Sequence, residues 1–123
     1  MKKITSLLLV LTFVSCYDTE HNCKDFKTGR YQSEITINGE KKVTTSVRTE
    51  KLVIETYEGK TDTASIRWIN DCEYVLQKIN PKSMAEKKAI DIKILTTSKK
   101  SYTFEFGIVG SDQKQRGNAT KMD

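Results

Sequence analysis

The stretch RYQSEITINGEKKVTTSVR (residues 30–48) decides the fold class of this chain. Apolar and polar residues alternate in both of its halves, and this period of two is typical of a β-strand with one buried face. The tripeptide NGE at residues 38–40 separates the halves, and Asn-Gly readily adopts the positive φ angles of a tight hairpin turn. We therefore predict a β-hairpin. The residues that share one face are Tyr31, Ile35 and Ile37 in the first strand and Val43, Thr45 and Val47 in the second.

The rest of the chain continues this strand pattern. The hairpin strands cover residues 30–37 and 42–48, and further strands are predicted at residues 51–57, 63–70, 73–79, 89–95, 101–109 and, more weakly, 113–121. The segment NPKSMAEKK interrupts the series with an Asn, a Pro and then helix formers, which predicts one short helical turn over residues 81–88. Eight strands with short connections predict an all-β antiparallel meander. We expect it to close into a small barrel or half-barrel, because closure removes unpaired strand edges.

The composition is that of one small globular domain. The 123 residues are 37% hydrophobic and 30% charged, with one Pro and six Gly, so no linker or low-complexity segment divides them. The 21 basic and 16 acidic residues give a net charge of +5, and without Lys2 and Lys3 the 19 remaining basic residues give +3. So small a charge does not form the basic surface that nucleic-acid binding needs, and we expect no nucleic-acid partner.

The N-terminus has the layout of a secretion leader. Lys2 and Lys3 precede an apolar run at residues 4–14, and a small residue, Ser15, then precedes Cys16. As a helix the apolar run would rise about 16 Å, which is too short for the ~30 Å hydrocarbon core of a bilayer. Residues 1–15 are therefore predicted to be a signal peptide.

The run of apolar residues, Ser15 and Cys16 resembles the lipobox of bacterial lipoproteins. The strand pattern predicts that residues 25–123 form a single β-barrel-like domain. The lipobox resemblance implies that Cys16 is lipidated and becomes the first residue of the mature chain, and that residues 16–24 form a tether. It also implies a membrane partner, through the acyl chains, and a place in the outer membrane. Asp18 and Glu20 suit either a solvated tether on the periplasmic face or display on the cell surface. The alternative is an ordinary signal peptide cut nearby, with Cys16 left as a disulfide partner.

Cys23 and Cys72 form an even pair once Cys16 is set aside, which favours a disulfide in an oxidising compartment. In the chain-entropy model, a bond that closes a loop of about 50 residues contributes roughly 4 kcal/mol. The competing interpretation is one reactive thiol and one bystander. A thiol nucleophile needs a base, however, and the only histidine is His21, in the expected tether.

Two family resemblances extend into the body of the chain. DFKTGRY (residues 25–31) is similar to the start of lipocalin-like (calycin) barrels, in which Gly29 and Tyr31 would open the first strand and Phe26 would plug one end. CKDFKTGRY, WINDCEY, NPKSMAEKK and SYTFEFG resemble blocks of a family of small uncharacterised envelope lipoproteins of Gram-negative bacteria. Some members are labelled DNA topoisomerase IV. The chain does not support that activity, because 123 residues hold no ATP-binding fold and no cleavage-domain tyrosine context.

The aromatic residues are the candidates for a ligand pocket, with core packing as the alternative role. With Phe26 and Tyr31 they are Trp68, Tyr74, Tyr102, Phe104 and Phe106. An eight-stranded barrel either fills its interior with side chains or holds one small ligand. The sequence therefore predicts a lipocalin-like barrel that binds a small apolar ligand, or alternatively a protein-binding module such as an enzyme inhibitor at the envelope.

Other functional classes lack the residues that they need. His21 alone does not build a zinc site, so neither a metal nor a cofactor is expected. No spacing selects a catalytic pair among the scattered carboxylates, which are Glu55, Glu73, Asp91 and Glu105. We therefore expect a monomer without enzymatic activity.

Overall fold

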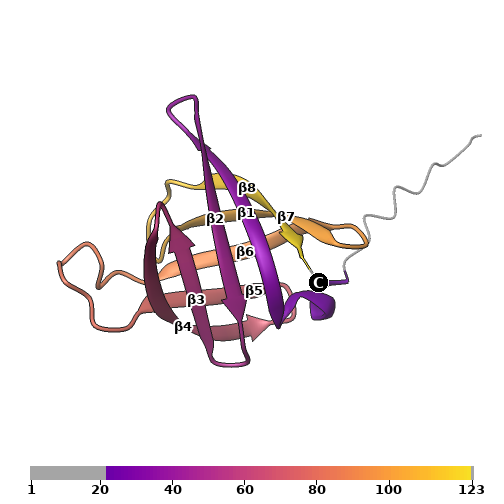
Figure 1. The fold of residues 1–123 in the computed structure, drawn as a ribbon, viewed down its shortest axis with the longest axis horizontal. Coiled ribbons are helices and arrows are strands. Elements are labelled where there is room, and N and C mark those ends of the chain that lie inside the picture. Colours follow the sequence, from indigo (N-terminus) through magenta and orange to yellow (C-terminus); the bar gives the residue numbers. More distant parts are fainter. Residues whose placement is uncertain (1–21, 123) are drawn as a thin grey trace, which may run out of the picture.

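The computed structural model describes residues 22–122, which form eight β-strands and one short 3₁₀ helix (Figure 1). All eight predicted strands are confirmed, with ends shifted by a few residues. The helix is η1 (Cys23–Phe26) and the strands are β1 (Gly29–Ile37), β2 (Glu40–Arg48), β3 (Leu52–Tyr57), β4 (Lys60–Asn70), β5 (Glu73–Lys78), β6 (Ile90–Thr97), β7 (Ser101–Ile108) and β8 (Gln115–Lys121).

The strands form a closed barrel and not a half-barrel. Each strand pairs antiparallel with the next one in the sequence, and β8 pairs with β1 to complete the ring. Gly117 makes this last contact possible. A Cβ at that position would lie 2.5 Å from Cγ2 of Ile35 and 2.7 Å from the carbonyl oxygen of Glu34. Only glycine lets β8 approach β1 so closely.

Two-residue turns join the hairpins of the first four strands. Ile37 pairs with Glu40, and the intervening Asn38 and Gly39 have φ angles of 53° and 75°. Glu58 and Gly59 repeat the arrangement between β3 and β4, with φ angles of 49° and 77°. Such turns match the right-handed twist of the strands that they connect. The hairpin that the sequence predicted around Asn-Gly is therefore confirmed.

The predicted helical turn over residues 81–88 is wrong. In the described chain only η1 is helical, and residues 84–87 form a hydrogen-bonded turn. Asn80 has a φ of 59°, whereas a residue that caps a helix usually has an extended backbone. The Glu86 carboxylate holds the loop instead, by accepting hydrogen bonds from the backbone N–H of Lys82 at 2.7 Å and from Nζ of Lys78 at 2.9 Å.

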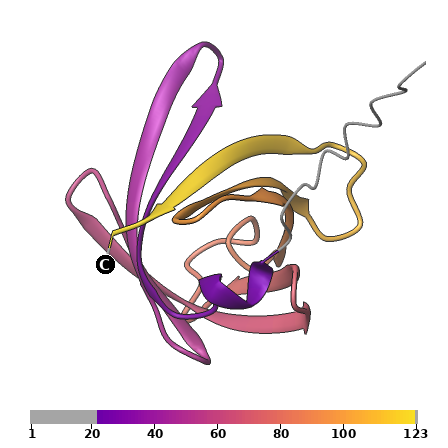
Figure 2. The ribbon, with the colours of Figure 1, turned by 90° about the vertical axis from the view of Figure 1, so that its right-hand side faces the viewer.

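The barrel has two different ends. We call the end covered by η1 the closed end; Figure 2 views the molecule from that side, with η1 lying across the ring of strands. The opposite end, the mouth, carries the two tight turns and the loop at residues 79–89, which lies on the left in Figure 1. Among residues 22–122, no helix is long and apolar enough to cross a membrane.

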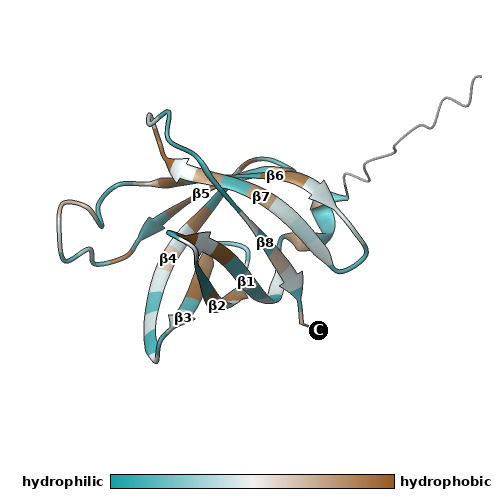
Figure 3. Cartoon of the chain, turned by 90° about the horizontal axis from the view of Figure 1, so that it is seen from above, coloured by the Kyte–Doolittle hydropathy of each residue, from teal (hydrophilic) through white to brown (hydrophobic). Residues whose placement is uncertain are grey.

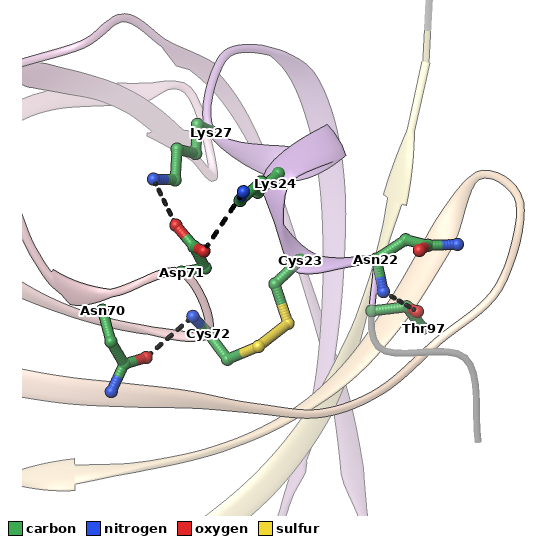
Figure 4. The surroundings of a disulfide bond; sticks show 8 residues. All are labelled: Asn22, Cys23, Lys24, Lys27, Asn70, Asp71, Cys72 and Thr97. Atoms are coloured by element: carbon green, nitrogen blue, oxygen red, sulfur yellow. Dashed lines mark hydrogen bonds and ion pairs between the residues drawn. A yellow bond between two sulfur atoms is a disulfide. The ribbon is translucent and has the colours of Figure 1, made fainter. Parts of the chain in front are cut away.

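A disulfide between Cys23 and Cys72 fastens η1 to the closed end (Figure 4). The two Cα atoms are 5.1 Å apart, and the bond joins η1 to the turn between β4 and β5. Beside it, Lys27 Nζ donates to the Asp71 carboxylate at 2.9 Å, and the backbone N–H of Cys72 donates to the side chain of Asn70 at 2.8 Å. The predicted disulfide is confirmed. Cys16 and His21 lie outside the described residues.

Apolar and polar residues alternate along the strands, as the banded colouring of Figure 3 shows. In β2, however, the more apolar face points outward. Val43 and Val47 are 40% and 41% exposed, whereas Ser46 and Arg48 are buried. The interior therefore receives a polar wall from β2, and this wall shapes the candidate site.

Candidate ligand-binding cavity

The barrel interior contains a hollow between the closed end and the mouth. Its volume is about 220 Å³, and a second hollow of about 380 Å³ adjoins it at the mouth. Ile35, Thr44 and Glu55 line both. Because ligand sites in proteins are usually concave and mostly apolar, these joined hollows are the candidate binding site.

The floor of the cavity is a packed aromatic cluster. Phe26 reaches in from η1, and its ring centroid lies 5.1 Å from that of Tyr102 and 6.4 Å from that of Tyr31. All three side chains are 1–2% exposed. The structure therefore places Phe26, Tyr31 and Tyr102 in the core of the closed end, where Phe26 fills the space beneath η1.

Arg48 fills the centre of the floor. Its guanidinium lies 4.0 Å above the Tyr31 ring, and it donates hydrogen bonds to the Phe26 carbonyl oxygen at 2.8 Å and to the Tyr102 hydroxyl at 2.7 Å. Burial opposes the charged form, but the hydroxyls of Tyr74 and Tyr102 raise the pKa of Arg48 above its ordinary value. Within the described chain no carboxylate forms an ion pair with it, and its Nε has no hydrogen-bond partner.

One wall of the cavity is apolar. It consists of residues from β5, β6 and β7, namely Leu76, Ile90, Ile92, Phe104 and Phe106. Phe104 is 6% exposed and Phe106 is partly buried, with ring centroids 5.7 Å apart. Of the predicted aromatic candidates, these two and Tyr74 face the hollow.

Tyr74 and Trp68 lie at the edge of the floor. The Tyr74 hydroxyl is 3.0 Å from that of Tyr102, and desolvation together with Tyr102 raises the pKa of Tyr74 well above its usual value. Trp68 packs on Tyr74 with ring centroids 4.6 Å apart and carries Lys27 over its ring. Trp68 is not part of the cavity lining and belongs to the core.

The opposite wall is polar and comes from β1, β2 and β3. Ser33 pairs across the strands with Thr44, and Ser46 pairs with Glu55. All four side chains line the hollow, and none of them makes a hydrogen bond within the described chain. Desolvation raises the pKa of Glu55, although Arg48 and Lys78 act against the rise.

Lysines surround the mouth. Hydrogen bonds to Tyr57 and then to Glu40 raise the pKa of Lys42, and hydrogen bonding to Glu86 does the same for Lys78. Lys78 lies 2.9 Å from Glu86 and 3.4 Å from Asp62, so acidic neighbours balance its charge.

The carboxylates that looked scattered in the sequence have three different settings. Glu55 faces the cavity, and Glu105 lies 3.8 Å from Arg116 on the outside. Glu73 and Asp91 meet on the outer surface of β5 and β6, where a hydrogen bond to Asp91 raises the pKa of Glu73. Sequence spacing did not select this pair, because the pairing of β5 with β6 brings the two residues together.

Sequence reasoning missed Arg48 and the polar wall. A polar residue in an alternating strand is ordinarily assigned to the outer face, and β2 reverses that assignment. The available signal was the pair of apolar positions Val43 and Val47, which place Thr44, Ser46 and Arg48 together on the other face.

Among residues 22–122, no group of three or more His, Cys, Asp or Glu side chains is placed to hold a metal ion. In comparisons with known proteins, no family model, no curated protein and no solved structure matches this chain.

Proposed function

We propose that this protein is a lipid-anchored, non-catalytic envelope lipoprotein whose barrel binds a small, largely apolar molecule. The observation that carries the proposal is the difference in filling inside the barrel. Aromatic side chains and Arg48 occupy the closed end, whereas the hollow above them is open toward the mouth. Burial of apolar ligand surface against Phe104 and Phe106 would supply the main driving force.

The volume of the hollow limits the size of the ligand. An apolar cavity of about 150 Å³ holds benzene, and the inner hollow measures about 220 Å³. A molecule with one or two rings fits this space, and a longer one would extend into the hollow at the mouth.

The proposed anchor would be attached near the closed end of the barrel. The backbone N–H of Asn22 donates to Thr97 at 2.9 Å, so the described chain begins at the closed end. A lipid on Cys16 would then tether the closed end and leave the mouth accessible. The intact mass of the natively expressed protein tests this step. Acyl chains on Cys16 would support it, and a normally processed, membrane-bound Cys16→Ser variant would contradict it.

Two neighbouring threonines provide a matched test of ligand binding. Thr44 lines the cavity, whereas Thr45 is exposed on the outside of the same strand. Titration with a fluorescent naphthalene probe should show binding by the wild type and by Thr45→Phe, and loss of binding by Thr44→Phe. Equal binding by all three proteins would place the probe outside the barrel and refute the proposal.

The alternative function, protein binding, is favoured by one observation. Four apolar side chains on the outside of β2 and β3 are 39–41% exposed, and they are Val43, Val47, Leu52 and Ile54. A purified envelope protein that binds stoichiometrically to the wild type, but not to a Val47→Lys variant with an intact cavity, would establish this function.

A further inference from the structure

The cavity is amphipathic in cross-section, and this restricts its ligand more than its volume does. Ser33, Thr44, Ser46 and Glu55 form one wall, and aliphatic and phenyl side chains form the other. A wholly apolar ligand would leave the four polar groups without partners, and unmade hydrogen bonds in a desolvated site are costly. The lining therefore matches a molecule with one apolar face and one hydrogen-bonding edge.

Glu55, on β3, is the carboxylate acceptor of this polar wall. It lies opposite Ser46 in the strand pairing and lines both hollows. It makes no hydrogen bond within the described chain, while its neighbours on the floor, Arg48 and the tyrosines, bond to one another. Of the groups on the two walls, Glu55 alone can carry a charge.

The charges around Glu55 favour a neutral ligand. Arg48 lies on the floor from β2, and three lysines from β2, β4 and β5 line the mouth, namely Lys42, Lys60 and Lys78. Lys42 is paired with Glu40 and Lys78 with Glu86 and Asp62, whereas Arg48 and Lys60 keep positive charge on both sides of the site, so a cation would be repelled. An anion that reaches the polar wall would meet the charge of Glu55 itself, whereas Asp62 from β4 is already paired with Lys78. A neutral O–H group has neither cost and still donates to the carboxylate.

We infer that the cavity selects a neutral molecule with a ring-sized apolar body and a hydroxyl group, and that this hydroxyl donates a hydrogen bond to Glu55. The inference rests on the proposed function. The raised pKa of Glu55 supports it. Desolvation destabilises a charged carboxylate that no hydrogen-bond donor contacts, and a ligand hydroxyl would supply that donor.

Four naphthalene probes of similar size test the inference by calorimetry or fluorescence at neutral pH. They carry a hydroxyl, a methyl, a carboxylate or an aminomethyl group at the same ring position. We expect the wild type to bind 2-naphthol about tenfold more tightly than 2-methylnaphthalene, as one hydrogen bond to a charged acceptor provides.

Variants assign the preference to Glu55. Glu55→Leu should bind both neutral probes equally, and Glu55→Gln, which keeps the side-chain shape and a weaker acceptor, should show an intermediate preference. Glu50→Leu, at an exposed position before β3, should behave as the wild type. Circular dichroism checks that each variant is folded.

The outcomes separate the two proposals. Equal wild-type affinity for naphthol and methylnaphthalene, or a preference for either charged probe, would overturn the inference and leave small-molecule binding in place. A hydroxyl preference that survives in Glu55→Leu would also overturn it. Failure of all four probes to bind would overturn the proposed function as well.

Discussion

The two ends of the barrel use the same strands in opposite ways. At the closed end, inward-facing side chains are buried and bonded to one another, with Arg48 joined to Phe26 and Tyr102 and the Cys23–Cys72 bond beside them. Toward the mouth, the strands β1, β2 and β3 carry serine, threonine and glutamate side chains that make no hydrogen bonds in the described chain. Polar groups are costly to leave unpaired away from water, so this difference separates the part that stabilises the fold from the part available to a ligand.

Two phenylalanines provide the largest expected contrast between the ends. Phe26→Ala should lower the free energy of unfolding by roughly 3–5 kcal/mol, because a fully buried ring leaves a cavity that the packed floor cannot close. Phe106→Ala should lower the free energy of unfolding by clearly less, since this ring is only partly buried and already borders a hollow. Urea denaturation of both variants measures the difference. Equal losses would show that the two ends are packed alike.

Removal of the disulfide should weaken the closed end by a slightly smaller amount. The double variant Cys23→Ser, Cys72→Ser should lose roughly 2–4 kcal/mol of unfolding free energy. The reason is that a cross-link between residues 49 positions apart no longer restricts the unfolded chain. Reduction of the wild type should produce a similar loss in the same denaturation experiment. A reduced protein as stable as the oxidised one would mean that η1 is held by packing alone.

Arg48→Lys tests the hydrogen bonds of the floor. A lysine keeps the charge but cannot stack on Tyr31 while also bonding to Phe26 and Tyr102, so we expect a loss of about 1–3 kcal/mol. Arg67 is exposed on the outside of β4, and Arg67→Lys should change stability by less than about 0.5 kcal/mol. Thermal unfolding of both variants makes the comparison, and matching losses would contradict it.

The smallest expected effect is the pH dependence of stability that Glu55 contributes. Its pKa in the folded protein lies above the ordinary value of 4.5, so the folded state holds the proton more tightly than the unfolded state does. The resulting stability is present below pH 4.5 and is lost as the pH rises through the raised pKa.

Glu55→Gln removes this titration. The stability of the wild type relative to the variant should therefore fall as the pH increases from about 4 to 7. Denaturant midpoints measured across that range test the prediction. A difference that stays constant, or that rises with pH, would show that the carboxyl is not desolvated in the cavity.

Much of the fold could be predicted because its signals are local. The alternation in each strand, the Asn38-Gly39 turn and the even pair of cysteines all act within short stretches or by simple counting. The same local reasoning failed over residues 81–88. There the Glu86 side chain binds Lys78 from the end of β5, a contact that helix propensities do not contain.

The site was less predictable than the fold. The aromatic residues were identified, but their division into floor and wall depends on the position of each within the barrel. Phe26 and Phe106 look alike in the sequence, yet one is the fully buried last residue of η1 and the other borders the hollow. Glu73 and Asp91 likewise meet only through the pairing of β5 with β6.

By itself, the sequence determined the number of strands, the Asn38-Gly39 turn and the disulfide pair, because these depend on a residue period, on backbone preferences and on cysteine parity. Only the tertiary structure decided which face of β2 and β3 points inward. A period of two divides a strand into two faces without saying which one is buried, and that choice depends on the neighbouring strands. The strand registers made the choice here: Ser46 lies opposite the buried Tyr31 and Glu55 lies opposite Ser46, which places Arg48 under the hollow and Glu55 in its wall.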